Sequence, residues 1–298
     1  MTNEISILEK NIEDLVFAIV GVGLIGGSYG KYLRKFKVKK IIGIDINENY
    51  LNKALDENII DEAYKNPNEA LKKADVIIFS IYPSTLVNFI KNNVKYFKEN
   101  VLLTDATGIK GKLIKEIEPL LGENMDFVFG HPMAGREGVG VGQSTGEMFK
   151  GASYILIPTS RNKEENIVWM ENFINLLECK DYIKVSPEKH DEIISYTSQL
   201  PHVMAVALVN SSNMDEDASY FIGGGYRDTT RVADINEDLW ADLFLDNKKF
   251  IVEEIKKLEI QLENWRNALE TEDANKLKNM MKMATIKRRG IINAKNKN

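Results

Sequence analysis

The stretch from residue 16 to residue 36 limits the possible folds of this 298-residue chain more than any other segment. It begins with the β-branched run VFAIV at 16–20, continues with GVGLIG at 21–26, and follows a helical pattern from Ile25 to Phe36. The apolar run predicts a buried strand, and the glycines predict a tight turn into a helix. A strand that turns directly into a helix is typical of a parallel α/β sheet.

The first half of the chain repeats this alternation of strand and helix. Short apolar runs at 40–45, 75–81, 101–105, 127–129 and 154–157 predict further strands, and 49–58 has the pattern of a helix. We therefore expect an α/β fold with a Rossmann-type, doubly wound parallel sheet and helices on both faces.

The glycines fit the spacing G-x-G-x-x-G, which binds a dinucleotide when it lies between a strand and a helix. Gly21 would allow the tight turn, Gly23 would let the backbone approach a pyrophosphate, and Gly26 would let helix and strand pack closely. Leu24 and Ile25 would start the helix, where free N–H groups favour negative charge. A P-loop is excluded, because no glycine stands at the required offset before residues 30–31.

Asp45 supports a dinucleotide site. It ends the second predicted strand, about 20 residues beyond the glycines, where a carboxylate accepts hydrogen bonds from ribose hydroxyls. A 2′-phosphate at this position would meet like charge, and Ile46 follows instead of an arginine. The predicted cofactor is therefore NAD rather than NADP.

Beyond about Val185 the strand signals stop and helical periods dominate. We place a domain boundary at Ser186, so that 1–185 would form the NAD-binding domain and 186–298 an all-helical domain for substrate binding and dimerisation. One helical stripe predicts a helix that buries one face against other helices, in the core or at a dimer interface. It consists of Ile251, Ile255, Leu258, Leu262, Trp265 and Leu269.

Composition excludes several classes of partner. The formal net charge of -5 disfavours nucleic-acid binding. The single cysteine, Cys179, allows neither an intrachain disulfide nor a cysteine-based zinc site, and we expect it to be partly buried. The first 15 residues lack the pattern of a signal peptide, and the most apolar stretch is too short to span a bilayer. We expect a cytoplasmic protein that binds no membrane and no metal.

Ligands of open α/β sheets bind beyond the carboxyl ends of the strands. Polar segments follow three predicted strands there, at 80–84, 105–110 and 129–137. The first of these segments offers Ser80 and Pro83 to a cofactor. His131 lies in the last of these, in a Gly/Pro-rich loop, and is either a general base or a structural loop residue. His202, at a helix kink, and His190, at a charged helix start, are interpreted from sequence alone as structural.

Three glycines at 223–225 precede Arg227 and Arg231. They suggest a flexible loop that presents two guanidinium groups, which bind carboxylates in bidentate fashion. Solvated surface arginines are the alternative.

Four blocks resemble the prephenate and arogenate dehydrogenases of tyrosine biosynthesis. They are GVGLIGGS at 21–28, HPMAGREGVG at 131–140, SQLPHVMAVAL at 198–208 and GGGYRDTTRVA at 223–233. The resemblance implies NAD-dependent oxidative decarboxylation of prephenate to 4-hydroxyphenylpyruvate, or of arogenate to tyrosine. It also implies a homodimer formed through the helical domain.

The resemblance further implies a role for each candidate residue. His131 would accept or polarise the proton of the ring hydroxyl. The substrate pocket would contain His202, Arg227 and Arg231, with Arg231 holding a carboxylate, and Glu137 would lie near its entrance or pair with an arginine. A serine that the family often has after the fourth strand is Gly108 here, so that either Thr107 or a water would supply its hydroxyl, and Gln199 replaces a frequent histidine.

Two other classes remain as alternatives. A β-hydroxyacid dehydrogenase would use a lysine on the helix between its domains, but 188–210 contains only Lys189. A catalytically silent NAD-binding regulator would have no reason to keep His131, His202 and Arg231 together.

Overall fold

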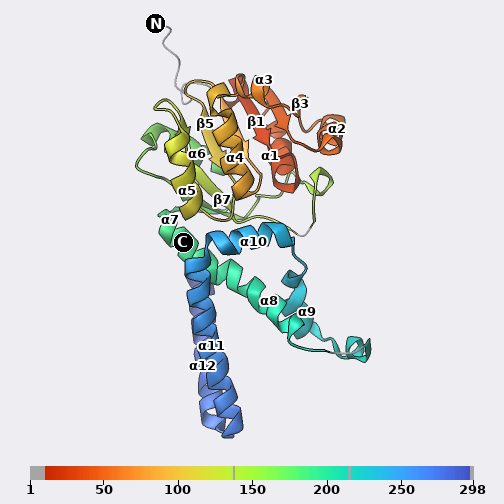
Figure 1. Cartoon of the computed structure of the whole chain (residues 1–298), viewed down its shortest axis with the longest axis vertical. Coiled ribbons are helices and arrows are strands. Elements are labelled where there is room, and N and C mark those ends of the chain that lie inside the picture. The colour runs from red at the N-terminus through yellow and green to blue at the C-terminus, as the bar shows by residue number, and fades with distance from the viewer. Residues whose placement is uncertain (1–10, 137, 214–215, 296–298) are drawn as a thin grey trace.

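The computed structural model describes residues 11–136, 138–213 and 216–295. An α/β region lies at one end and a group of long helices at the other (Figure 1). In chain order the elements are η2 (Ile12–Asp14), β1 (Val16–Val20), α1 (Leu24–Lys35), β2 (Lys40–Ile44), α2 (Glu48–Asp56), β3 (Glu62–Tyr64), α3 (Asn68–Leu71), β4 (Val76–Phe79), α4 (Pro83–Asn93), η3 (Val94–Tyr96), β5 (Leu102–Asp105), α5 (Gly111–Ile117), η4 (Glu118–Leu120), β6 (Asp126–Phe127), β7 (Phe129–Pro132), η5 (Val141–Gln143), β8 (Ser153–Ile157), α6 (Glu164–Leu176), β9 (Asp181–Lys184), α7 (Pro187–Ile194), η6 (Ser195–Gln199), α8 (Leu200–Asn210), η7 (Glu216–Phe221), α9 (Gly224–Thr230), η8 (Arg231–Ala233), α10 (Glu237–Asp246), α11 (Lys248–Glu270) and α12 (Ala274–Lys295).

The main sheet has six parallel strands in the order β3-β2-β1-β4-β5-β6. The strand order reverses between β1 and β4, which is the switch point at which Rossmann folds bind their ligands. The predicted fold class, a Rossmann-type parallel sheet followed by a helical region, is confirmed.

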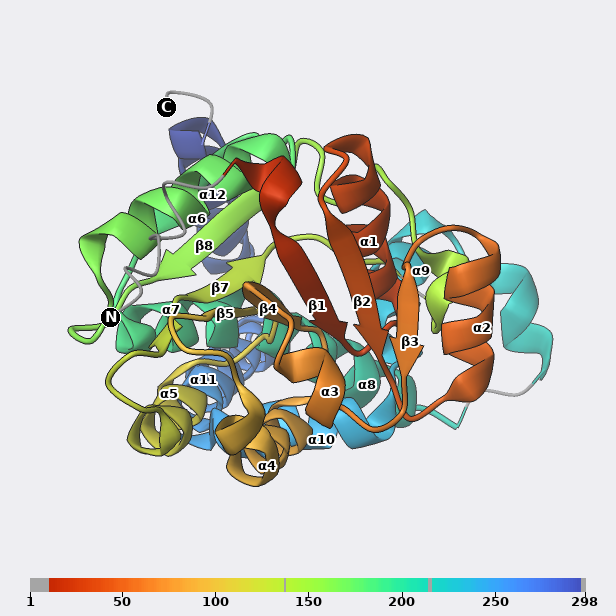
Figure 2. The same cartoon turned by 90° about the horizontal axis from the view of Figure 1, so that it is seen from above.

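The side chains of β1 alternate between the two faces of the sheet, and each face is covered by its own layer of helices. Phe17 and Ile19 belong to a core shared with α1 and α6, where Phe17 stacks on Phe173 with ring centroids 6.0 Å apart. Ala18 and Val20 point to the opposite face, into a core shared with α3, α4 and α5. Figure 2 shows these helices on the two sides of the sheet. Because successive side chains of a strand point to opposite faces, the one apolar run of β1 packs against both layers.

The structure differs from the prediction beyond β5. The run 127–129 is not one strand: Phe127 completes the main sheet together with Asp126 as β6, whereas Phe129 begins β7 in a second sheet with the order β7-β8-β9. In that sheet β7 and β8 are antiparallel, so the expectation of parallel strands alone was wrong there. The switch occurs at Val128, whose N–H still donates to Leu103 of the main sheet. The strands β3 and β9 were not predicted from the sequence.

The helical region begins at α7, where the Ser186 side chain accepts a hydrogen bond from the N–H of Lys189. Residues 224–230 form helix α9, so the prediction of a flexible glycine loop before the arginines was wrong. No helix within the described ranges combines the length and apolar character that a membrane crossing needs.

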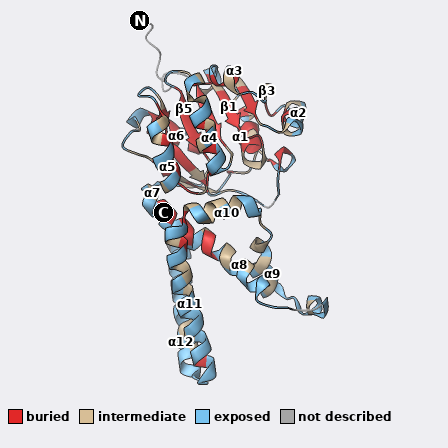
Figure 3. Cartoon of the chain, viewed as in Figure 1, coloured by how far each residue is buried: buried red, intermediate tan, exposed pale blue. Residues whose placement is uncertain are grey.

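The α11–α12 hairpin projects away from the rest of the chain and is largely exposed (Figure 3). Ile251, near its base, is 4% exposed, but Leu262 and Leu269 are 59% and 60% exposed. Other helices of the same chain therefore cover the stripe near its base, and of the two predicted locations the dimer interface stays a prediction for its far end. Most of this apolar face is left uncovered within one copy of the chain.

Candidate active site

The glycine turn leaves open space at the start of α1. Gly21 has a φ of +89°, which L side chains rarely adopt, and a Cβ there would lie 2.5 Å from the Ser80 carbonyl oxygen. A Cβ on Gly26 would overlap the Gly21 carbonyl, whereas one on Gly23 would have no atom within 4 Å. Because Gly23 precedes the first residue of α1, the unpaired N–H groups of the first turn border this space.

Asp45 directly follows β2 and is bound to the glycine turn. Its Oδ2 accepts a hydrogen bond of 2.7 Å from the N–H of Val22, and its Oδ1 accepts one of 2.8 Å from the N–H of Asn47. Each carboxylate oxygen can accept a further bond, so the group can still bind hydroxyls. Ile46 beside it is 89% exposed. Among the described residues the buried hydroxyl of Ser80, at the end of β4, has no hydrogen-bond partner.

These features fit a dinucleotide. The open space at the helix start suits a pyrophosphate, and the carboxylate beside it suits a ribose. Pro83, the first residue of α4, follows Ser80 at the same edge of the sheet.

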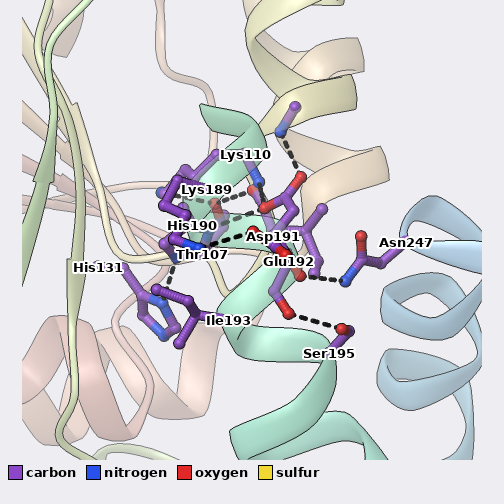
Figure 4. Close-up of polar contacts among 12 residues, drawn as sticks. Thr107, Lys110, His131, Lys189, His190, Asp191, Glu192, Ile193, Ser195 and Asn247 are labelled. Carbon is purple, nitrogen blue, oxygen red and sulfur yellow. Dashed lines mark hydrogen bonds and ion pairs between the residues drawn. The ribbon is translucent and has the colours of Figure 1, made fainter. Parts of the chain in front are cut away.

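His131 lies inside β7, opposite Ile155 of β8, and not in a loop as predicted. Its Nδ1 is 2.9 Å from Nε2 of His190, and the two rings meet at 63°. Nδ1 of His190 in turn lies 2.7 Å from Oδ1 of Asp191. Figure 4 shows that these side chains form a chain of contacts from α7 to β7. The interpretation of His190 as merely structural overlooked its contact with the candidate base.

Asp191 is held from two sides. Its Oδ1 accepts from the N–H of Lys110 at 3.0 Å, and its Oδ2 accepts from the N–H of Gly111 at 2.7 Å. Asn247, at the start of α11, donates to the Asp191 carbonyl at 2.9 Å. These bonds join α7 to the start of α5 and to α11, so the position of His190 is set by both regions of the chain.

Behind His131 lies a buried polar cluster centred on Lys110. The Lys110 ammonium group is fully buried and donates to Asp105 at 2.5 Å, to the Gly130 carbonyl at 2.6 Å and to the Thr107 hydroxyl at 3.1 Å. The Thr107 hydroxyl itself donates to Asp105 through a very short bond. Among the described residues the Thr107 hydroxyl therefore bonds to Asp105 and Lys110 and makes no hydrogen bond with His131.

Gly108 lies beside the candidate base. A Cβ on Gly108 would be 4.0 Å from Cε1 of His131 and 3.6 Å from Cδ2 of Leu243, both ordinary contact distances. The space beside His131 at this position is thus open to a small group.

The electrostatic surroundings of both imidazoles lower their pKa values and so favour the neutral form. Burial lowers the pKa of His131 well below its usual value, and the nearby His190 and Lys110 lower it further. Burial also lowers the pKa of His190, although Asp191 opposes this shift. A neutral imidazole can accept a proton, which a general base must do.

His202 belongs to a second group of candidate residues. Its ring lies on the indole of Trp240, with centroids 3.7 Å apart, and its Nδ1 is 2.8 Å from the Ser198 carbonyl oxygen. Burial lowers the pKa of His202, and the positive charge of Arg231 adds to this shift. Arg227 and Arg231 are both exposed and stand one helical turn apart, at α9 and η8. Glu137 lies outside the described residues.

Helix α10 connects the two groups. Trp240 stacks on His202, and Leu243, almost one turn later, reaches the Gly108 position beside His131. Gln199, which replaces a histidine frequent in the family, is buried and donates to the Leu243 carbonyl at 2.7 Å. Gln199 therefore helps to hold α10 in place through the Leu243 carbonyl. Near the start of α4, Ser84 donates to Asp242 of α10 at 2.7 Å.

Lys189, the one lysine at 188–210, is exposed and pairs with Glu192.

A parallel sheet with a glycine turn, joined to a helical region that carries histidine and arginine, defines a two-domain dehydrogenase. Residues 29–182 match the family model "Prephenate dehydrogenase, nucleotide-binding domain", and residues 186–283 match "Prephenate dehydrogenase, dimerization domain". The chain belongs to the prephenate dehydrogenase family.

Individual relatives agree with this family. A prephenate dehydrogenase of Bacillus subtilis is 31% identical over 279 residues, which cover 92% of this chain and 75% of the relative. The cyclohexadienyl dehydrogenase of Zymomonas mobilis is 26% identical over 273 residues, which cover 87% of this chain and 90% of the relative. The solved prephenate dehydrogenase of A. aeolicus, in complex with hydroxyphenyl propionate and NAD+, superposes with a TM-score of 0.87 at 33% identity, covering 95% of this chain and 100% of that one.

Proposed function

We propose that the chain catalyses the NAD-dependent oxidative decarboxylation of prephenate to 4-hydroxyphenylpyruvate. The observation that carries this proposal is the imidazole of His131, which lies on β7 next to the parallel sheet, with its Nδ1 2.9 Å from Nε2 of His190. The names of the relatives support the choice of substrate, since the B. subtilis protein is a prephenate dehydrogenase and the A. aeolicus prephenate dehydrogenase was solved in complex with hydroxyphenyl propionate and NAD+.

Several residues at the sheet edge would hold the cofactor. The glycine turn would take the pyrophosphate on the first N–H groups of α1, and Asp45 would accept hydrogen bonds from the adenosine ribose. When bound, NAD accepts a hydride from the carbinol carbon of the substrate. The proposed cofactor site consists of Gly21, Gly23, Leu24, Ile25, Gly26, Asp45, Ser80 and Pro83.

The protein's own contribution is a base and an anion site. His131 accepts the hydroxyl proton as the hydride leaves the carbinol carbon, the ring carboxylate departs as CO₂, and the ring becomes an aromatic phenolate, to which His131 returns the proton. Arg231 binds a substrate carboxylate by charge-assisted hydrogen bonds, with His202 beside it and Arg227 one turn away. Leu243 and Trp240 cover the site with apolar surface, which limits access of water. In this proposal Thr107 orders the Asp105–Lys110 cluster instead of touching the substrate.

The helical region is proposed to form a homodimer. Its family model is named for dimerisation, and Leu262 and Leu269 of α11 expose an apolar face that a second copy would bury. Light scattering should give twice the chain mass for the native protein and one chain mass for Leu262→Glu/Leu269→Glu. A monomeric native protein would reject this proposal. We retain 1–185 and 186–298 as the two domains, and a cytoplasmic location as a prediction from composition.

Absorbance of NADH after addition of NAD⁺ and prephenate tests the main proposal, with arogenate in parallel. We expect faster turnover of prephenate. Turnover of arogenate alone would replace the substrate and keep the reaction class. No reduction of NAD⁺ by either compound would reject the function.

A further inference from the structure

We propose that His190 is a positioning residue that, together with Asp191, holds His131 with its proton on Nδ1 and an unprotonated Nε2 facing the substrate. The tautomer follows from the contacts within the chain, whereas its use in catalysis rests on the proposed function. The contacts run over three side chains, from α7 to β7 (Figure 4).

The direction of the hydrogen bonds begins at Asp191. A carboxylate only accepts, so the 2.7 Å contact between its Oδ1 and Nδ1 of His190 requires the proton on that nitrogen. A neutral imidazole has one ring proton, which leaves Nε2 of His190 as an acceptor. The 2.9 Å contact with His131 then requires His131 to donate from Nδ1. The free lone pair of His131 is therefore on Nε2.

The surrounding charges support neutral rings throughout this chain of contacts. From the α5 side His131 faces the buried cation Lys110, which pairs with Asp105 of β5, and from α7 it faces His190 with Asp191 behind it. An imidazolium at His131 would lie near the Lys110 cation in a buried site, where repulsion is weakly screened. A second positive charge is thus disfavoured, and the tautomer assignment holds near neutral pH.

His190 can enforce the tautomer of His131 because the Asp191 carboxylate that binds His190 is held in one orientation. Two backbone N–H groups, of Lys110 and Gly111, bind the Asp191 carboxylate, and Asn247 binds its carbonyl. The base lies on β7 of the second sheet, whereas its orienting residue lies on α7, the first helix of the helical region. The correct tautomer of His131 therefore depends on the docking of α7 against the start of α5.

Nitrogen-15 NMR of histidine-labelled full-length protein tests the assignment directly, because the chain has three histidines and protonated and unprotonated ring nitrogens have well-separated shifts. His131→Asn and His202→Asn identify the signals. We expect one protonated Nδ1 and one unprotonated Nε2 for His131 at pH 7.5. A proton on Nε2 of His131 in the native protein would overturn the proposal, whatever the variants of His190 do.

Two matched variants separate positioning from packing. His190→Gln can keep an acceptor towards His131, whereas His190→Asn can keep a donor towards Asp191 but does not reach His131. We expect mixed His131 tautomers and a kcat lowered about 10- to 10³-fold in His190→Asn, with KM for NAD⁺ within twofold and partial recovery in His190→Gln. An unchanged His131 tautomer and kcat in His190→Asn would overturn the proposal. An inactive native protein with the expected tautomer would support this inference and reject the proposed function.

Discussion

The imidazole of His202 lies on the indole of Trp240, with ring centroids 3.7 Å apart and planes inclined by 30°. The contact joins α8 to α10, and Leu243 of α10 reaches the space beside His131. Trp240 thus contributes to the orientation of His202 and to the connection between the two groups of candidate residues.

Loss of this stack is expected to weaken substrate binding. Trp240→Leu should raise KM for prephenate about tenfold, because aromatic pairs contribute about 0.5–1.5 kcal/mol beyond the area they bury. Affinity for NADH, measured by fluorescence titration, should stay unchanged. Trp240→Phe is the matched control and should retain most of the effect of the ring. An unchanged KM in Trp240→Leu would show that the stack has no role in binding.

Arg231→Ala is expected to act mainly on KM for prephenate. A charge-assisted hydrogen bond contributes about 1.5–3 kcal/mol, so removal of the guanidinium should raise KM by about 10- to 150-fold. Steady-state kinetics should show a smaller change in kcat. Arg227→Ala, one turn earlier on the same segment, is the control and should change KM less. Equal effects of the two substitutions would contradict the assignment of the carboxylate to Arg231.

Asp45 and Ile46 are expected to determine the choice between NAD and NADP. Asp45→Ala should weaken NADH binding about tenfold, since it removes acceptors for the ribose hydroxyls. Asp45→Ser/Ile46→Arg should bind NADPH more tightly than the native chain does, because repulsion is replaced by attraction. Titrations with both cofactors measure this, and Ile46→Ala controls for loss of the apolar side chain. Preference for NADPH in the native chain would contradict the account.

Thr107 is expected to affect stability more than turnover. Its hydroxyl donates to Asp105 and accepts from the buried Lys110, so Thr107→Val should lower the free energy of unfolding by about 1–3 kcal/mol. Thr107→Ser keeps the hydroxyl and should stay close to the native value in urea denaturation. A large loss of kcat in Thr107→Val with native stability would instead show that Thr107 acts on the substrate, as the sequence suggested.

Local signals predicted the first half of the fold well. The apolar run at 16–20, the glycine turn and Asp45 depend on neighbours close in sequence, and the structure has them where the pattern predicts. The strand β9 was missed because it carries no apolar alternation, with Ile183 57% exposed. Helix α9 was missed because glycines disfavour helices locally, whereas its packing on α8 favours one.

The contacts that form the candidate site join residues far apart in sequence, so local sequence patterns could not predict them. His131 and His190 are 59 residues apart, and His190 stands in a charged helix start that resembles a solvated surface. The helix start was visible from Ser186 and Pro187, but nothing near His190 indicates that its partner would come from β7. The burial of Lys110 could not be predicted either, because a lysine at a strand end is more often exposed than fully buried.

The central claim is that His131 is the base of an NAD-dependent dehydrogenase, and one paired measurement on His131→Asn tests it most directly. Turnover of prephenate and NADH affinity should be determined on the same preparation. The account predicts a kcat lowered by about 10²–10⁴, with a dissociation constant for NADH within twofold of the native value. A turnover within a few-fold of native, or a parallel loss of turnover and NADH affinity, would contradict it.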